Sequence, residues 1–108
     1  MPQSRQARWT DLGPADLLPG DSRSVEADYR NVVLFNVNGT YYALEDVCTH
    51  DGGELSGGPF EGTVVTCPRH GAQFDVRTGQ ALCMPAVTPA PAFAARVENG
   101  RVLVDLGD

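Results

Sequence analysis

The chain has 108 residues, 42% of them apolar, and a formal net charge of −6. Its size and composition fit one globular domain, and its 8 basic residues, all arginine, leave no basic patch for nucleic acid or an anionic membrane. No apolar run approaches the roughly 20 residues of a membrane span, and residues 1–10 lack the apolar stretch of a signal peptide.

Short β-branched and aromatic runs predict strands along most of the chain. The strongest are 31–37 and 40–45, which flank Asn38-Gly39, a pair that favours a type I′ hairpin turn because both turn positions need positive φ. Asn99-Gly100 repeats this signature near the C-terminus. The expected strands are 9–12, 22–27, 31–37, 40–45, 63–66, 73–76, 93–98 and 101–105.

Three stretches interrupt this pattern. Residues 13–20 are too short and too rich in proline and glycine for a helix, so we expect a single helical or 3₁₀ turn that leads into a Pro-Gly turn. Residues 46–60 are rich in glycine and show no period. Residues 82–92 contain prolines that cannot donate to a central strand ladder, which predicts a rigid extended loop.

No long segment shows a helical period, so the chain is predicted to be all-β, a small antiparallel β-sandwich or open barrel. Aromatic residues in or beside the expected strands are the candidate core. These are Trp9, Phe35, Tyr41, Tyr42 and Phe93.

Two short motifs, Cys48-Thr49-His50 and Cys67-Pro68-Arg69-His70, contain both histidines and two of the three cysteines. Cysteine and histidine together favour zinc or iron, and a mixed Cys₂His₂ zinc site is chemically possible. Because the cysteine count is odd and two cysteines lie beside histidines, a disulfide framework explains the pattern poorly. We therefore expect a reducing, cytoplasmic location.

The spacing C-x-H-x₁₆-C-x₂-H resembles the Rieske iron–sulfur signature, and the chain is most similar to the small Rieske ferredoxins of bacterial ring-hydroxylating dioxygenases. The resemblance implies one [2Fe–2S] cluster per chain, with Cys48 and Cys67 on one iron and His50 and His70 on the other. It also implies a single Rieske domain over residues 1–108, with a cluster-binding subdomain inserted at about 46–80.

Two departures from the high-potential members of this family predict a low potential. Those proteins carry an extra disulfide-forming cysteine in each loop, where this chain has Gly53 and Arg69. They also carry serine and tyrosine hydroxyls that bond to sulfur, where this chain has Ala72 and Phe74. Each missing hydrogen bond removes stabilisation of the more negative, reduced cluster.

The resemblance implies a soluble one-electron carrier, monomeric and without catalytic residues of its own. Its donor is expected to be an NAD(P)H-dependent flavin reductase, and its acceptor a terminal non-haem-iron oxygenase. Two alternatives remain open at this point. One is the small subunit of an NAD(P)H nitrite reductase, which shares the fold, and the other is a structural zinc-binding module.

Acidic residues in and around the first motif have two interpretations. They form a solvated surface, or they form a rim on which a basic partner docks; the residues are Asp46, Asp51, Glu54 and Glu61. Cys83 lies outside both motifs, and we expect it to be buried or half-buried in the proline-bearing loop; the alternative interpretation is a redox-sensing thiol.

Overall fold

The computed structural model describes residues 8–27, 30–47, 53–68, 71–84 and 88–107. Their regular secondary structure is entirely strand, and they include no helix that could cross a membrane. The strands are β1 (Trp9–Pro14), β2 (Ser22–Ala27), β3 (Arg30–Val37), β4 (Thr40–Glu45), β5 (Phe60–Glu61), β6 (Val64–Thr66), β7 (Gln73–Asp75), β8 (Ala81–Cys83), β9 (Ala92–Phe93), β10 (Ala95–Glu98) and β11 (Arg101–Asp105).

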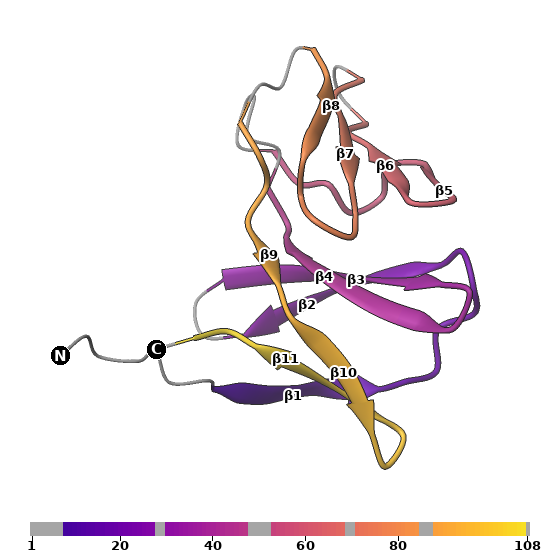
Figure 1. Ribbon diagram of the computed structural model, residues 1–108, viewed down its shortest axis with the longest axis vertical. Coiled ribbons are helices and arrows are strands. Elements are labelled where there is room, and N and C mark those ends of the chain that lie inside the picture. The colour runs from indigo at the N-terminus through magenta and orange to yellow at the C-terminus, as the bar shows by residue number, and fades with distance from the viewer. Residues whose placement is uncertain (1–7, 28–29, 48–52, 69–70, 85–87, 108) are drawn as a thin grey trace, which may run out of the picture.

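These strands form antiparallel sheets in three layers (Figure 1). A base sheet has the order β1-β11-β10, a middle sheet β2-β3-β4-β9, and an upper sheet β5-β6-β7-β8. The base and middle sheets correspond to the predicted sandwich. The upper sheet is drawn above them in Figure 1 and carries the second Cys/His motif between β6 and β7.

Strand β3 is buried on both faces because it lies in the middle layer. Successive side chains of a strand point to opposite faces. Val32 and Leu34 therefore pack with the base sheet, in a cluster that includes Val102 and Val104. Val33 and Phe35 pack toward the upper sheet, in a cluster that includes Val65, Cys67 and Phe74. The uninterrupted apolar run at 32–35 is thus explained by burial on two sides.

Both predicted Asn-Gly hairpins are confirmed. Asn38 and Gly39 have φ values of 52° and 95°, and they join β3 to β4 with Val37 opposite Thr40. Asn99 and Gly100 have φ values of 52° and 74° and join β10 to β11. Positive φ at both central positions is the geometry that a type I′ turn requires.

The prediction that Trp9 anchors the core is wrong. Trp9 is 36% exposed on the base sheet, and the Arg96 guanidinium lies 4.2 Å from the centre of its ring. A cation over an indole face is stabilised by the ring quadrupole, so Trp9 makes a favourable contact at the surface without being buried in the core. Phe35 and Tyr41, in contrast, are buried, while Tyr42 and Phe93 are partly buried against the two clusters.

Two other local predictions are wrong. Residues 13–18 form no helical turn, because β1 continues to Pro14, but the expected Pro-Gly turn is present: the Asp21 amide donates to the Leu18 carbonyl at 3.0 Å across Pro19-Gly20. The stretch 82–92 is not wholly a loop, because β8 pairs with β7 and Ala92 begins β9. Its described prolines, Pro89 and Pro91, lie outside the paired positions, and the strand residues of this stretch lie at its two ends.

Candidate metal centre

The second motif occupies the turn between two paired strands. Thr66, the last residue of β6, lies opposite Gln73, the first of β7. The Cys67 amide donates to the Ala72 carbonyl at 2.7 Å, and the Gly71 amide donates back to the Cys67 carbonyl at 3.2 Å. This loop is therefore closed by its own main chain.

The Cys67 side chain is a free thiol that is shielded from solvent, as expected of a metal ligand in a buried site. Its side chain is 1% exposed and forms no disulfide. It packs in the cluster between the middle and upper sheets, which protects it from solvent while its backbone is held at both ends of the turn. The remaining predicted ligands, Cys48, His50 and His70, lie outside the described residues.

The first motif follows β4, and the described residues on either side of it are held together by Asp46. The carboxylate Oδ1 of Asp46 accepts hydrogen bonds from the amides of Leu55 at 2.7 Å and Ser56 at 2.8 Å. Its Oδ2 accepts a third from Ser24 Oγ at 3.0 Å. Asp46 is only 6% exposed, so its interpretation as part of a solvated or docking surface is wrong.

The two loops meet at Gly58. A Cβ on this residue would fall onto the Thr66 carbonyl oxygen and would lie 3.1 Å from the Leu55 carbonyl oxygen. Leu55 is fully buried in the same cluster as Cys67 and Ala72. The end of the first loop therefore packs directly against the start of the second, and only glycine fits at the junction.

The positions expected to distinguish this chain from high-potential relatives are both buried. Ala72 and Phe74 have no exposed surface, and both belong to the cluster that contains Cys67. Neither side chain carries a hydroxyl. The apolar surroundings of Cys67 therefore include no hydrogen-bond donor from these two side chains.

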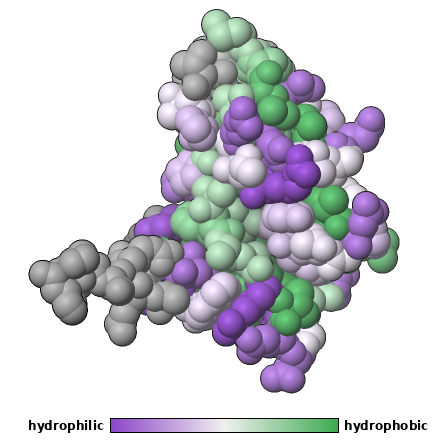
Figure 2. All heavy atoms as spheres, viewed as in Figure 1, coloured by the Kyte–Doolittle hydropathy of each residue, from purple (hydrophilic) through white to green (hydrophobic). Residues whose placement is uncertain are grey.

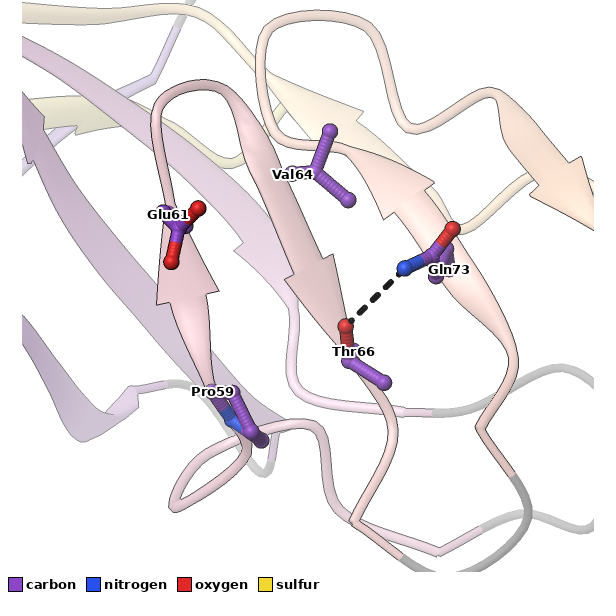
Figure 3. Close-up of a pocket in the computed structure, with 5 residues that line it drawn as sticks. All are labelled: Pro59, Glu61, Val64, Thr66 and Gln73. Atoms are coloured by element: carbon purple, nitrogen blue, oxygen red, sulfur yellow. Dashed lines mark hydrogen bonds between the residues drawn. The ribbon is translucent and has the colours of Figure 1, made fainter.

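The outer face of the upper sheet has a pocket of about 330 Å³, lined by Pro59, Glu61, Val64, Thr66 and Gln73 (Figure 3). On this face, Gln73 Nε2 donates to Thr66 Oγ1 at 3.4 Å. The Glu61 carboxylate is exposed and has no hydrogen bond or ion pair with any described residue. A cationic group in this pocket would lie against Thr66, the residue that precedes Cys67 in the sequence.

Cys83 is exposed, so the prediction that it is buried or half-buried is wrong. Its Sγ lies 3.6 Å from Gln73 Oε1 and 3.7 Å from the Gly71 carbonyl oxygen. Its neighbours Leu82 and Met84 are 44% and 73% exposed. Figure 2 shows apolar residues at the upper end of the molecule, where Figure 1 places β8.

One ion pair lies beyond the second loop, in the turn after β7. Arg77 Nη2 lies 3.0 Å from Asp75 Oδ2, and the Arg77 amide donates to Asp75 Oδ1 at 2.9 Å. The hydrogen bond from the guanidinium lowers the pKa of the Asp75 carboxyl and raises the pKa of Arg77. This pair stabilises the turn that leads the chain from β7 to β8.

A family model described as Rieske [2Fe-2S] domain matches residues 8–94. The chain therefore belongs to the Rieske [2Fe–2S] domain family. The ferredoxin component of the naphthalene 1,2-dioxygenase system of Pseudomonas putida is 38% identical over 100 residues, which cover 92% of this chain and 96% of that protein. The 3-phenylpropionate/cinnamic acid dioxygenase ferredoxin subunit of Escherichia coli K12 is 38% identical over 93 residues, covering 85% and 87%.

Solved structures of dioxygenase ferredoxin systems also resemble this chain in fold. The ferredoxin of carbazole 1,9a-dioxygenase from Nocardioides aromaticivorans IC177 superposes with a TM-score of 0.86 at 29% identity, over 90% of this chain and 96% of that one. A chain in the complex of reduced oxygenase and oxidized ferredoxin in carbazole 1,9a-dioxygenase superposes with a TM-score of 0.85 at 35% identity, over 90% and 92%.

These matches confirm the predicted Rieske fold, the ferredoxin type and a cofactor of one [2Fe–2S] cluster per chain. A ferredoxin carries electrons and transforms no substrate itself, so the prediction of an electron-transfer component rather than an enzyme is also confirmed. The family match decides against the structural zinc module, and the named relatives favour a dioxygenase ferredoxin over a nitrite reductase subunit.

Sequence reasoning identified Cys67 but missed the role of Asp46. The signal was present: an aspartate two residues before a ligand motif, followed by a glycine-rich stretch, is a typical acceptor for the backbone amides of a turn. What the sequence did not reveal is that the amides of Leu55 and Ser56 return to it from the far end of the loop.

Proposed function

We propose that this protein is the one-electron carrier of a ring-hydroxylating oxygenase system, with Cys48 and Cys67 holding one iron of the cluster and His50 and His70 the other. The observation that carries the proposal is Cys67, a buried free thiol at the end of a turn closed by its own main chain. When bound, the cluster supplies reversible one-electron chemistry. The protein then binds, shelters and orients it.

We propose a low midpoint potential, within the family range of about −150 to +300 mV. The support lies in Ala72 and Phe74, which are buried beside Cys67 and offer no hydroxyl to a sulfur atom. Gly53 and Arg69 cannot form a disulfide between the two loops. Without these polar contacts, the extra negative charge of the reduced state is less well stabilised.

The proposed partners are a flavin-dependent reductase fed by NAD(P)H and a terminal oxygenase. Of the four acidic residues first considered for docking, Glu54 and Glu61 are exposed, Asp46 is buried, and Asp51 lies outside the described residues. The pocket at Glu61 is therefore the favoured contact for a basic side chain of a partner (Figure 3). Its lining residue Thr66 immediately precedes Cys67 in the sequence, so a partner bound there would lie beside the start of the second ligand loop.

This docking proposal is tested with Glu61→Gln. Reduction by the reductase of the same organism should slow at low ionic strength, and added salt should slow the parent more than the variant, because screening removes an attraction that the variant lacks. Glu26→Gln is the control, since Glu26 is an exposed carboxylate on β2 of the middle sheet. Equal slowing in both variants would show that only net charge matters.

We further propose that residues 1–108 act as one domain, with the cluster held by the segment at about 46–80, and that the protein is a cytoplasmic monomer. The purified protein should be red-brown, bleach with dithionite, contain two irons per chain and give the EPR spectrum of a Rieske centre. A colourless protein that holds one zinc would disprove the redox function. Size-exclusion chromatography with light scattering tests the monomer.

A further inference from the structure

The carboxylate of Asp46 is placed where two distant backbone segments converge. Its own amide donates to the Asn31 carbonyl of β3 at 2.8 Å, which anchors the residue to the middle sheet. Its Oδ1 accepts from two consecutive amides, those of Leu55 and Ser56. With Ser24 Oγ on Oδ2, the buried charge is satisfied on both oxygens.

These bonds join the two ends of one loop. Asp46 precedes Cys48 by two residues, and Leu55 follows His50 by five. No strand pairing links β4 to β5, the described strands on either side of this loop. The carboxylate thus supplies here the closure that main-chain pairing supplies in the second loop.

We propose that Asp46 is a positioning residue that closes the first ligand loop and sets where that loop meets Cys67. The inference rests on the proposed ligand set and deepens it. Because hydrogen bonds to a charged acceptor are worth more than those between neutral groups, two amides on one buried carboxylate form a strong closure. Residues outside the set of ligands commonly control metal affinity in this way.

The closure reaches the second loop through a short chain of contacts. Leu55 donates its amide to Asp46 and buries its side chain beside Cys67. Its carbonyl accepts from the Gly58 amide at 3.1 Å, and Gly58 lies against the Thr66 carbonyl. Releasing Leu55 from Asp46 would therefore loosen the loop ends and their contact with the turn at Cys67.

The test compares Asp46 with a matched aspartate in the base sheet. Asp105 is 8% exposed, and its Oδ1 also accepts two backbone amides, those of Arg8 and Gly107, both at 2.9 Å. The variants Asp46→Ala, Asp46→Asn, Asp105→Ala and Asp105→Asn are purified with bound cluster. Iron release to a chelator is followed by loss of the visible absorbance.

Asp46→Ala should release iron about tenfold faster than both the parent and Asp105→Ala, in line with the usual effect of losing a group that orients a ligand. Asp46→Asn should release iron at a rate between those of the parent and Asp46→Ala, because its amide oxygen still accepts from Leu55 and Ser56 but carries no charge. Equal release from Asp46→Ala and Asp105→Ala would overturn the proposal, as would Asp46→Asn releasing iron as fast as Asp46→Ala.

Amide hydrogen exchange separates this inference from the proposed function. In the parent, a peptide covering residues 53–60 should exchange slowly at Leu55 and Ser56, and this protection should be lost in Asp46→Ala but kept in Asp105→Ala. Unchanged protection in Asp46→Ala would overturn the closure. If the parent held no iron, the proposed function would fail, and the exchange result would still decide whether Asp46 closes the loop.

Discussion

The two ligand loops are closed by different means. In the second, between β6 and β7, the amides of Cys67 and Gly71 bond to carbonyls within the same turn. In the first, which follows β4, closure depends on the side chain of Asp46. A main-chain closure survives most substitutions because every residue except proline carries the same amide and carbonyl. A side-chain closure is lost with a single residue.

The difference follows from the sheet topology. Strands β6 and β7 are neighbours, so the turn between them inherits their register, with Thr66 opposite Gln73. Strand β4 belongs to the middle sheet and β5 to the upper sheet, so no ladder brings the ends of the first loop together. The amides of Leu55 and Ser56 therefore have no ladder partner, and the Asp46 side chain accepts their hydrogen bonds instead.

The largest effect is expected where the two loops touch. Gly58→Ala should lower the free energy of unfolding by more than about 3 kcal/mol, because the added methyl group collides with the Thr66 carbonyl oxygen and backbone must move. Urea denaturation measures the loss. Gly62→Ala is the control: Gly62 has a φ of 62° and open space around it, so only the left-handed cost of about 1–2 kcal/mol applies. Equal losses of stability in Gly58→Ala and Gly62→Ala would show that the contact between Gly58 and Thr66 is not the source of the strain.

A hydroxyl in the second loop should change the potential of the cluster. Ala72→Ser should raise the midpoint potential by about 40 mV for each kcal/mol by which the hydroxyl favours the reduced state. Protein-film voltammetry measures this shift. Ala43→Ser is the control, because Ala43 is equally buried but packs in the cluster shared by the middle and base sheets. An unchanged potential in Ala72→Ser would show that residue 72 does not present its side chain to sulfur.

A smaller effect is expected at the Asp75–Arg77 pair. The Arg77 guanidinium lowers the pKa of Asp75, so its contribution to stability is present above the ordinary aspartate pKa of about 3.9 and is lost as pH falls through the lowered value. Asp75→Asn should cost at most about 1 kcal/mol at pH 7, because Arg77 is half exposed, and the cost should be smaller at pH 3. Urea denaturation at both pH values measures the difference.

Iron release in Asp75→Asn should stay at the parent rate, because main chain and not a carboxylate closes the second loop. Glu26→Gln controls for loss of one negative charge. Faster release from Asp75→Asn alone would show that the second loop also depends on a side chain.

The smallest effect is expected at Cys83. Cys83→Ser should leave the free energy of unfolding within about 0.5 kcal/mol of the parent, because the thiol is exposed and its contacts at 3.6 Å and 3.7 Å are weak. The potential should also be unchanged. Iodoacetamide should label Cys83 in the cluster-loaded parent while Cys67 stays protected, as mass spectrometry would show. A large loss of iron from Cys83→Ser would assign the thiol a structural role in the second loop.

Much of the fold could be predicted because its signals are local. The turns at Asn38-Gly39 and Asn99-Gly100 need positive φ, and their flanking apolar runs have to be strands. The failures are positions whose environment depends on distant residues. Trp9 is satisfied by Arg96 across the base sheet, and β8 exists because β7 lies beside it.

The amino-acid sequence by itself determined the chemistry: two motifs of cysteine and histidine at the spacing of a Rieske site, within an acidic chain of short strands. Only the tertiary structure decided how the site is assembled. Asp46 became a buried acceptor rather than a surface charge because Leu55 and Ser56 return to it from the far end of the loop. Ligand identity is a property of residue type and spacing, whereas closure of a loop between layers depends on contacts that form only when the sheets are stacked.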